Sequence, residues 1–171
     1  METSFTGRVW VLGDDIDTDI IIPTEYLALK TIDDMKQYGF SPLRPELAAQ
    51  IRKGDIIVAG KNFGCGSSRE QAPEIIKALG IQCVIAKSFA RIFFRNSINL
   101  GLPLIVCKGI SKEVKDGQEL ILDIEKGTVT VKETGKVYAC DRLGDQAMKI
   151  LEAGGIKPMM RARMEKEKAS C

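Results

Sequence analysis

The sequence predicts an α/β fold, in which short buried strands alternate with helices. Apolar runs lie within residues 55–60, 83–86 and 102–107, and their short length is typical of buried strands. Between them, residues 71–79 and 89–100 carry apolar side chains at helical spacing. The resulting order is strand, helix, strand, helix, strand, and the chain after it is expected to be rich in β-structure. We therefore expect a compact α/β domain whose loops meet at one edge.

The chain before these elements is predicted to begin with a strand and to continue in irregular structure. The strand is expected at 7–13, where a glycine ends it, and an acidic loop follows at 14–19. A short apolar run then stops at Pro23. Residues 24–45 show no clear period beyond one helical turn, and a short helix is expected at 46–52.

The later elements are predicted from their end signals. Ser88 is expected to cap the helix at 89–100, which Gly101 ends. A hairpin is expected over 119–131, about a turn that contains glycine. A further helix is expected at 144–153, and residues 158–171 are predicted to be a loose tail because they are mostly charged and small.

Length and charge limit the class of protein. The chain has 171 residues, so a single domain over residues 1–171 is the expectation. The 25 basic and 23 acidic residues leave a net charge of +2, which gives no strong field for nucleic acid or a membrane surface. No apolar run approaches the roughly 20 residues that a membrane span needs, and the N-terminus lacks the regions of a secretory signal. We therefore predict a cytoplasmic protein without nucleic-acid or membrane partners.

The cysteines and the missing histidines restrict the chemistry. The five cysteines have no Cys-x-x-Cys spacing, which argues against a zinc site or an iron–sulfur cluster held by this chain alone. We therefore predict no metal ligand and no cofactor on it. Because the chain has no histidine, it cannot build a Ser-His-Asp or Cys-His catalyst. Cys65 is expected to be exposed and to serve as a spacer.

The segment from Gly64 to Glu70, Gly-Cys-Gly-Ser-Ser-Arg-Glu, concentrates the polar chemistry of the chain. Gly64 and Gly66 allow a sharp backbone turn and a close approach to a ligand. Two hydroxyls and the Arg69 guanidinium then precede a predicted helix, whose free N–H groups favour an anion. A guanidinium can grip a carboxylate through two parallel hydrogen bonds, so this segment predicts a site for a small acidic molecule.

A purely structural interpretation of the same segment stays open. Ser67 could cap the following helix, and Glu70, three residues later, would complete a capping box. Capping would account for one serine and the glutamate, but it leaves the second glycine and Arg69 unexplained.

Four motifs in one order resemble a known family. The motifs are Gly-Asp-Asp-Ile-Asp-Thr-Asp at 13–19 with Ile-Ile-Pro at 21–23, Tyr26-Leu27, Asn-Phe-Gly-Cys-Gly-Ser-Ser-Arg-Glu at 62–70, and Ala-Lys-Ser-Phe-Ala-Arg-Ile-Phe at 86–93. Together they resemble the small subunit of 3-isopropylmalate dehydratase, a member of the aconitase superfamily in its two-chain form. The likeness runs from about residue 7 to residue 106 and more loosely to residue 155.

The resemblance implies a swivelling β/β/α domain of the aconitase C-terminal type. It also implies a large partner subunit that carries a 4Fe–4S cluster, so that most of the active site would lie on another chain. The implied reaction interconverts 2-isopropylmalate and 3-isopropylmalate by dehydration and rehydration, in leucine biosynthesis. A homo-oligomer of the heterodimer is left open.

Site residues follow from the same resemblance. Ser67 matches the catalytic base, and Ser68 and Arg69 match contacts to substrate. Asp17 and Thr18 belong to a segment that resembles one near the active site, and we predict from the resemblance that both bind the substrate. At least two of Asp14, Asp15, Asp17 and Asp19 are interpreted as part of a solvated turn only.

The substrate is predicted from the loop after Tyr26 and Leu27, which resembles the loop that reads the variable side group. Here Ala28 and Leu29 are apolar, and Lys30 follows. A homoaconitase is expected to carry an arginine directly after Tyr-Leu, so an alkyl-substituted malate is favoured. A homoaconitase or dimethylmalate dehydratase subunit, and a non-catalytic carboxylate-binding module, remain alternatives.

One helix is also expected to carry a basic stripe. Lys87, Arg91 and Arg95 lie along the helix predicted at 89–100 and just before it. We interpret the stripe as surface or subunit interface, and Asn96 as a cap residue.

Overall fold

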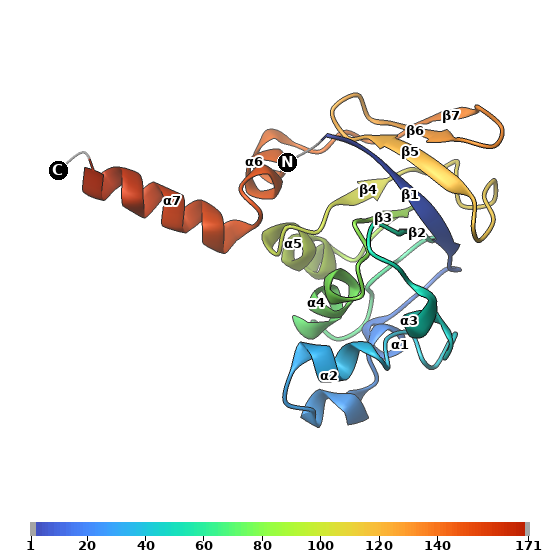
Figure 1. Ribbon diagram of the computed structural model, residues 1–171, viewed down its shortest axis with the longest axis horizontal. Helices are drawn as coiled ribbons and strands as arrows, with labels where there is room; N and C mark the ends of the chain where they lie inside the picture. The colour runs from blue at the N-terminus through green and yellow to red at the C-terminus, as the bar shows by residue number, and fades with distance from the viewer. Residues whose placement is uncertain (1–2, 170–171) are drawn as a thin grey trace.

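The structure is a computed structural model and describes residues 3–169. Its centre is a seven-stranded sheet with the strand order β4-β3-β2-β1-β5-β6-β7 (Figure 1). The strands are β1 (Ser4–Val11), β2 (Ile56–Val58), β3 (Cys83–Ala86), β4 (Leu104–Val106), β5 (Glu119–Asp123), β6 (Thr128–Val131) and β7 (Val137–Ala139).

Helices connect the strands and flank the sheet. They are α1 (Thr18–Ile21), the 3-10 helix η1 (Thr24–Ala28), α2 (Ile32–Lys36), α3 (Leu47–Gln50), α4 (Gln71–Ala78), α5 (Arg91–Asn99), α6 (Asp145–Glu152) and α7 (Ile156–Ala169). None of the helices in this described part has both the length and the apolar composition to cross a bilayer.

Strand β1 joins two different halves of the sheet. Its C-terminal end pairs in parallel with β2, with Trp10 opposite Ile57. Its N-terminal end pairs antiparallel with β5, with Gly7 opposite Leu120. The strands β2, β3 and β4 are parallel, as their helical crossovers α4 and α5 require, whereas β5, β6 and β7 form an antiparallel meander.

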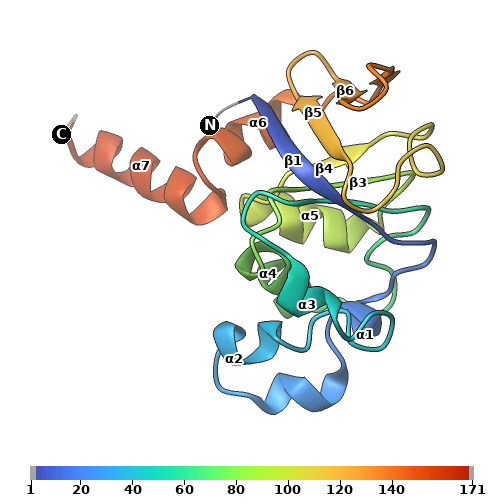
Figure 2. The same ribbon diagram turned by 45° about the vertical axis from the view of Figure 1, so that its right-hand side comes forward.

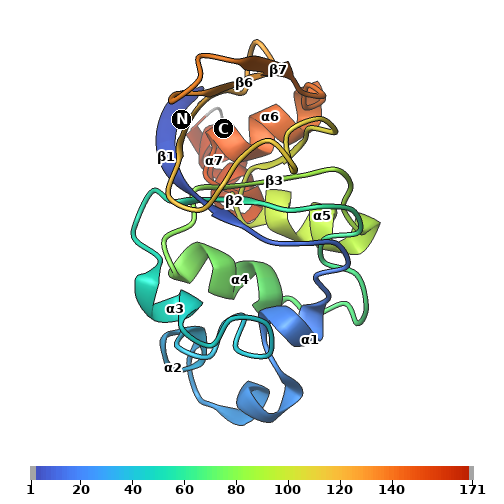
Figure 3. The same cartoon turned by 90° about the vertical axis from the view of Figure 1, so that its right-hand side faces the viewer.

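The two halves of the sheet pack against each other. Side chains of the parallel half, such as Ile56 and Ile85, share one buried cluster with Leu120, Leu122 and Val129 of the antiparallel half. The opposite face of the parallel half lies on α4 and α5, through a second cluster. Figure 3 shows the resulting layers, with β6 and β7 above β2 and β3, and α4 below them. This curled sheet covered by helices confirms the β/β/α fold implied by the resemblance.

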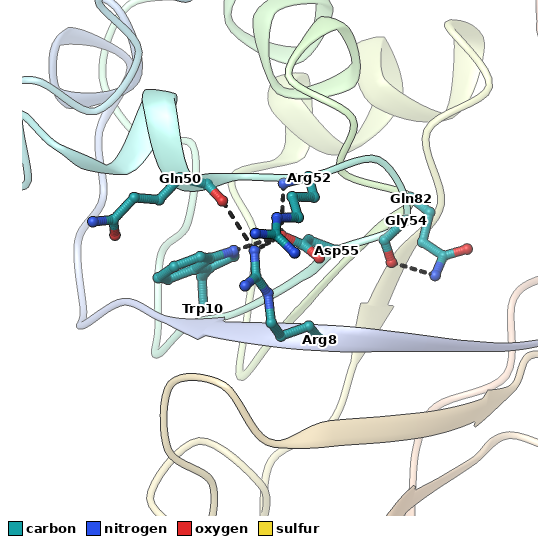
Figure 4. Close-up of polar contacts among 7 residues, drawn as sticks. All are labelled: Arg8, Trp10, Gln50, Arg52, Gly54, Asp55 and Gln82. Carbon is teal, nitrogen blue, oxygen red and sulfur yellow. Dashed lines mark hydrogen bonds and ion pairs between the residues drawn. The ribbon is translucent and has the colours of Figure 1, made fainter.

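A buried carboxylate fixes the start of β2 (Figure 4). Asp55 is 4% exposed and accepts hydrogen bonds from Trp10 Nε1 at 2.8 Å, the Arg52 backbone N–H at 2.8 Å and Arg8 Nη2 at 3.0 Å. Arg8 Nη2 also donates to the Gln50 carbonyl at 2.9 Å. These contacts tie β1 to the turn between α3 and β2, so β2 is anchored at the end opposite its following loop.

The C-terminus differs from the prediction. Residues 158–169 are helical as part of α7, so the loose tail predicted at 158–171 is wrong for them, and residues 170–171 lie outside the described part. Ile156 and Met159 pack on a cluster formed by α5 and α6, and most of the later residues are strong helix formers. Pro158 lies in the first turn, where it removes no helical hydrogen bond. The rest of α7 projects from the body (Figure 2).

The other predicted elements are found with small shifts in their ends. The strands predicted around 55–60, 83–86 and 102–107 are β2, β3 and β4, and the predicted hairpin is β5 and β6. The short strand β7 was not predicted. The prediction of a single domain stays a prediction.

Candidate active site

The glycine loop, residues 64–70, leads from β2 into α4 but does not cap this helix. Helix α4 begins at Gln71, and no side chain accepts a hydrogen bond at its N-terminus. Ser67 lies four residues earlier, and its hydroxyl bonds to nothing within residues 3–169. The capping-box interpretation of Ser67 and Glu70 is therefore wrong. Within residues 3–169 the Ser67 side chain therefore makes no hydrogen bond that would stabilise the fold.

The two glycines of the loop are needed for its conformation. Gly64 has φ +84 and Gly66 has φ +93, a region that other residues rarely adopt. Gly64 also lies against the ring of Phe93 in α5, where a Cβ would overlap with the side chain. A bridge between Phe63 and Phe89 runs alongside and holds the loop beside the start of α5. Gly64 and Gly66 therefore allow the backbone conformation of the loop.

Helix α1 clamps the loop from the other side. The Thr18 backbone N–H donates to the Cys65 carbonyl at 2.9 Å, and the Thr18 hydroxyl donates to the Ser67 carbonyl at 2.9 Å. Thr18 is 2% exposed, whereas Asp17 caps α1 through its Oδ1, which accepts from Ile20 N–H at 2.8 Å. The hydroxyl of Thr18 and one carboxylate oxygen of Asp17 are thus engaged in holding the loop and α1.

Arg69 connects the loop to the segment after α1. Its Nη1 lies 2.6 Å from Asp19 Oδ1 and donates to the Ile22 carbonyl at 3.0 Å. Its Nη2 donates to the Thr24 hydroxyl at 2.8 Å. The Nε–H takes part in none of these contacts. Because the side chain is only 14% exposed, the guanidinium is held in one orientation with part of its donor set still free.

The loop borders a cavity of about 450 Å³. The exposed Ser67 and Ser68 line it together with Arg69, and the first turn of α5 forms the facing wall. Arg91 and Arg95 also line this cavity, and no aspartate or glutamate does. A hollow lined by three arginines and by three hydroxyl side chains, those of Ser67, Ser68 and Thr18, with no carboxylate in its lining, favours an anionic ligand.

The backbone around Ser67 adds further donors. Among the described residues, the N–H groups of Gly66, Ser67, Ser68 and Arg69 donate no hydrogen bond. Unpaired N–H groups beside a hydroxyl resemble the donors that stabilise a developing negative charge. The loop can therefore stabilise an anion at or near Ser67 Oγ.

The predicted specificity loop, Tyr26 to Lys30, does not line this cavity. The ring of Tyr26 stacks on Tyr38 with centroids 3.9 Å apart, and Leu27 packs on the cluster between η1, α2 and α4. Ala28, Leu29 and Lys30 are exposed at the tip. This chain by itself thus leaves the tip facing solvent.

Sequence reasoning missed the contribution of α5 to the cavity. Arg91, Arg95 and Asn96 line it, although the sequence indicated a surface or subunit interface for the two arginines and a cap role for Asn96. The signal available was the spacing of the two arginines, four residues apart on one helix face. Their proximity to the loop depends on the Phe63–Phe89 bridge, which no local pattern indicates.

Cys65 and the other candidate metal ligands show no metal site. Cys65 is partly buried, and this burial is the main reason why the pKa of its thiol is raised. The negative charges of Asp17 and Asp15 raise the pKa further. The thiol therefore stays protonated at neutral pH. Nowhere in the described chain do three or more His, Cys, Asp or Glu side chains gather as metal ligands would.

The fold and the loop together define a swivelling domain of the aconitase type, and the comparison with known families agrees. The model of the aconitase C-terminal domain matches residues 19–108. The chain is 64% identical over 161 residues to the 3-isopropylmalate dehydratase small subunit of Lachnospira eligens, which covers 94% of this chain and 96% of the relative. This chain belongs to the family of 3-isopropylmalate dehydratase small subunits.

Other relatives have different names within the same family. The isopropylmalate/citramalate isomerase small subunit of Methanocaldococcus jannaschii is 48% identical over 96% of this chain and 98% of its own length. The methanogen homoaconitase small subunit of Methanothermobacter thermautotrophicus is 48% identical over 91% of this chain and 90% of its own length. A crystal structure described as 3-isopropylmalate dehydratase of Methanocaldococcus jannaschii superposes with a TM-score of 0.94, at 39% identity and with 98% and 99% of the two chains covered.

Proposed function

We propose that this chain is the small subunit of a hydro-lyase that interconverts 2-isopropylmalate and 3-isopropylmalate, acting with a large subunit in the cytoplasm. The observation that carries the proposal is the cavity beside residues 64–70, which brings Ser67, Ser68 and Arg69 together without any carboxylate. A substituted malate has two carboxylates, so its charge is complementary to this cavity.

Ser67 is the proposed base. It would take the proton from the carbon next to the one that loses hydroxide during dehydration. During rehydration it would give a proton to the neighbouring carbon, while hydroxide adds to the carbon that was deprotonated. A serine hydroxyl is a weak base unless its anion is stabilised. The free N–H groups of residues 66–69 and the nearby guanidinium of Arg69 supply that stabilisation, and exclusion of water would strengthen it.

Ser68 and Arg69 are the proposed ligands of one substrate carboxylate. The free Nε–H of Arg69 can donate to it while Nη1 and Nη2 remain bound to the chain. Asp17 and Thr18 would act mainly by holding the loop, because the Thr18 hydroxyl donates to the loop backbone and the Asp17 carboxylate accepts a hydrogen bond from α1.

A 4Fe–4S cluster does not fit the residues of this chain. Within residues 3–169 no cluster of three or more candidate ligands exists, and none of the cysteines lies near another at cluster spacing in the sequence. We place the cluster on the large subunit, and we assign to this chain the proton transfer and the carboxylate contacts alone.

The tip of the specificity loop is proposed to meet the alkyl group of the substrate once the large subunit covers it. Ala28 and Leu29 offer apolar surface there, and burying an alkyl group gains about 0.8 kcal/mol per CH₂. The homoaconitase named among the relatives makes a tricarboxylate the second candidate substrate. Lys30 is the residue that would favour it, because it could pair with the added carboxylate.

The test uses the chain together with its matched large subunit. Catalytic efficiencies for 3-isopropylmalate, citramalate and homoaconitate should rank 3-isopropylmalate first. Ala28→Arg should shift the ratio toward homoaconitate, with Lys126→Arg as a control far from the loop. A wild-type complex that prefers homoaconitate would promote the second candidate. Dicarboxylate binding by the isolated chain, with no turnover by the complex, would favour a binding module instead.

A further inference from the structure

The exposed surface of α5 carries two arginines one helical turn apart and an exposed isoleucine beside them. Arg91, Ile92 and Arg95, here called the α5 ridge, come from the first and second turns of the helix. Both arginines are exposed, and Ile92 is 56% exposed although it is a large apolar side chain. In Figure 3 the start of α5 lies on the same side of the molecule as α1.

The charges of the ridge are not neutralised by this chain. Within residues 3–169, Arg91 and Arg95 form no ion pair and no hydrogen bond, whereas Arg69 is paired with Asp19. Like charges four residues apart on a helix repel each other, and Arg91 lies at the positive end of the helix dipole. The arrangement is electrostatically unfavourable in the isolated chain, which indicates that carboxylates from elsewhere compensate it.

The surroundings of the α5 ridge indicate that the compensating carboxylates come from a protein rather than from a small molecule. Arg91 and Arg95 border the cavity of about 450 Å³ on one side. They also border a second hollow of about 300 Å³, which includes Phe89 and Phe94, on the other. Neither hollow is lined by an acidic residue. Two arginines between two hollows, with the exposed Ile92 beside them on the side of the larger hollow, are typical of a surface that contacts a protein partner.

We propose that the α5 ridge docks the large subunit, which presents carboxylates to Arg91 and Arg95 and an apolar pocket to Ile92. This inference rests on the proposed function, because the partner is the chain that closes the cavity beside Ser67. The ridge shares that cavity, so a partner that closes it must pass over the arginines. Charged contacts of Arg91 and Arg95 beside the apolar contact of Ile92 would set both the orientation and the rate of association.

The experiment measures the dissociation constant between the two subunits at several salt concentrations. Arg91→Glu with Arg95→Glu should weaken binding by about 100-fold or more at low salt and reduce its salt dependence. Ile92→Asp should weaken binding by about tenfold or more. The matched control is Lys112→Glu with Lys126→Glu, an equal charge change at exposed loop positions outside both hollows, which should leave the dissociation constant within about threefold of wild type.

Stability separates docking from a folding defect. Arg91→Glu places an acid at the start of α5, so the melting temperature of the isolated chain should stay equal or rise while subunit binding weakens.

Unchanged subunit affinity in the ridge variants would overturn the inference. Unchanged affinity with a raised KM would also overturn it, and would make the arginines a substrate subsite. If wild-type subunits bind each other but show no isomerase activity, the proposed function fails. The affinities of the ridge variants then still show whether the α5 ridge docks the large subunit. If the wild-type subunits do not bind, both proposals fail.

Discussion

At the scale of single residues, Ser67 and Arg69 differ in how much their side chains contribute to the folded structure. The Ser67 hydroxyl has no partner in the described chain and faces the cavity, so its loss should change little but chemistry. Arg69 bonds to Asp19 in α1 and to Ile22 and Thr24 after it, so its side chain combines a structural and a proposed binding role.

Ser67→Ala should lower the turnover of the assembled enzyme by about 10²–10⁴-fold or more, because no histidine can replace the base. Its free energy of unfolding should change by less than about 0.5 kcal/mol, since no hydrogen bond is lost. Steady-state kinetics and thermal unfolding measure the two effects, with Ser111→Ala as the control. A stable variant that keeps its activity would contradict the role as base.

Arg69→Lys should be nearly as harmful as Arg69→Ala. A lysine keeps the charge, but it cannot hold the Ile22 carbonyl and the Thr24 hydroxyl while a third donor meets the substrate. Loss of a charge-assisted hydrogen bond predicts a rise in KM of about 10–100-fold. Asp19→Asn is the control, because it removes only the ion pair. A lysine variant with normal KM would mean that positive charge alone suffices.

At the scale of elements, strand β2 is fixed at both ends. Asp55 anchors its start to Trp10 and Arg8, and the loop after its end is clamped by Thr18 and lies against Phe93. A displacement at either end would move Ser67 relative to α5. The site therefore depends on a network that lies at the opposite end of the strand (Figure 4).

Asp55→Asn should lower the free energy of unfolding by about 2–3 kcal/mol. All three donors bond to the same oxygen, Asp55 Oδ2, which an amide oxygen could replace, but the amide carries no charge. The ion pair with Arg8 is therefore lost, and the three hydrogen bonds lose their charge assistance. Glu46→Gln, which disrupts an exposed ion pair with Arg44, should cost less than about 0.5 kcal/mol. Chemical denaturation of both variants makes the comparison. Equal losses would show that burial of Asp55 adds nothing.

At the scale of the whole molecule, the core between the two halves of the sheet determines how stability responds to pH. Cys83 lies fully buried in this core, and burial raises the pKa of its thiol above the ordinary value of 9.0. The unfolded chain releases this proton above about pH 9, whereas the folded chain keeps it. The contribution of Cys83 to stability is therefore complete below pH 9 and is lost as the pH rises.

Cys83→Ala tests this pH dependence. Between about pH 9.5 and 10.5, the free energy of unfolding of the wild type should fall by about 1.4 kcal/mol more than that of the variant. The cavity left by the missing sulfur lowers stability at every pH, and the other titrating groups are common to both chains. Denaturation curves at each pH give the difference. A difference that does not change with pH would contradict the prediction.

The sequence by itself determined the alternation of strands and helices, the glycine loop and the family. These features depend on residues close together in the chain, such as the two glycines and the Ser-Ser-Arg that follows them. The positive φ of Gly64 and Gly66 and the start of α4 after the loop follow from the same local pattern.

Only the tertiary structure determined which segments, distant in the sequence, come together at the site. Thr18 and Ser67 are 49 residues apart, yet a hydrogen bond joins them, and the arginines of α5 reach the cavity because Phe63 and Phe89 pair. The helix that replaces the predicted loose tail likewise depends on Met159 packing onto α5 and α6. Such contacts form only when whole elements pack, so the free energy that selects them is a property of the assembled core rather than of any short segment.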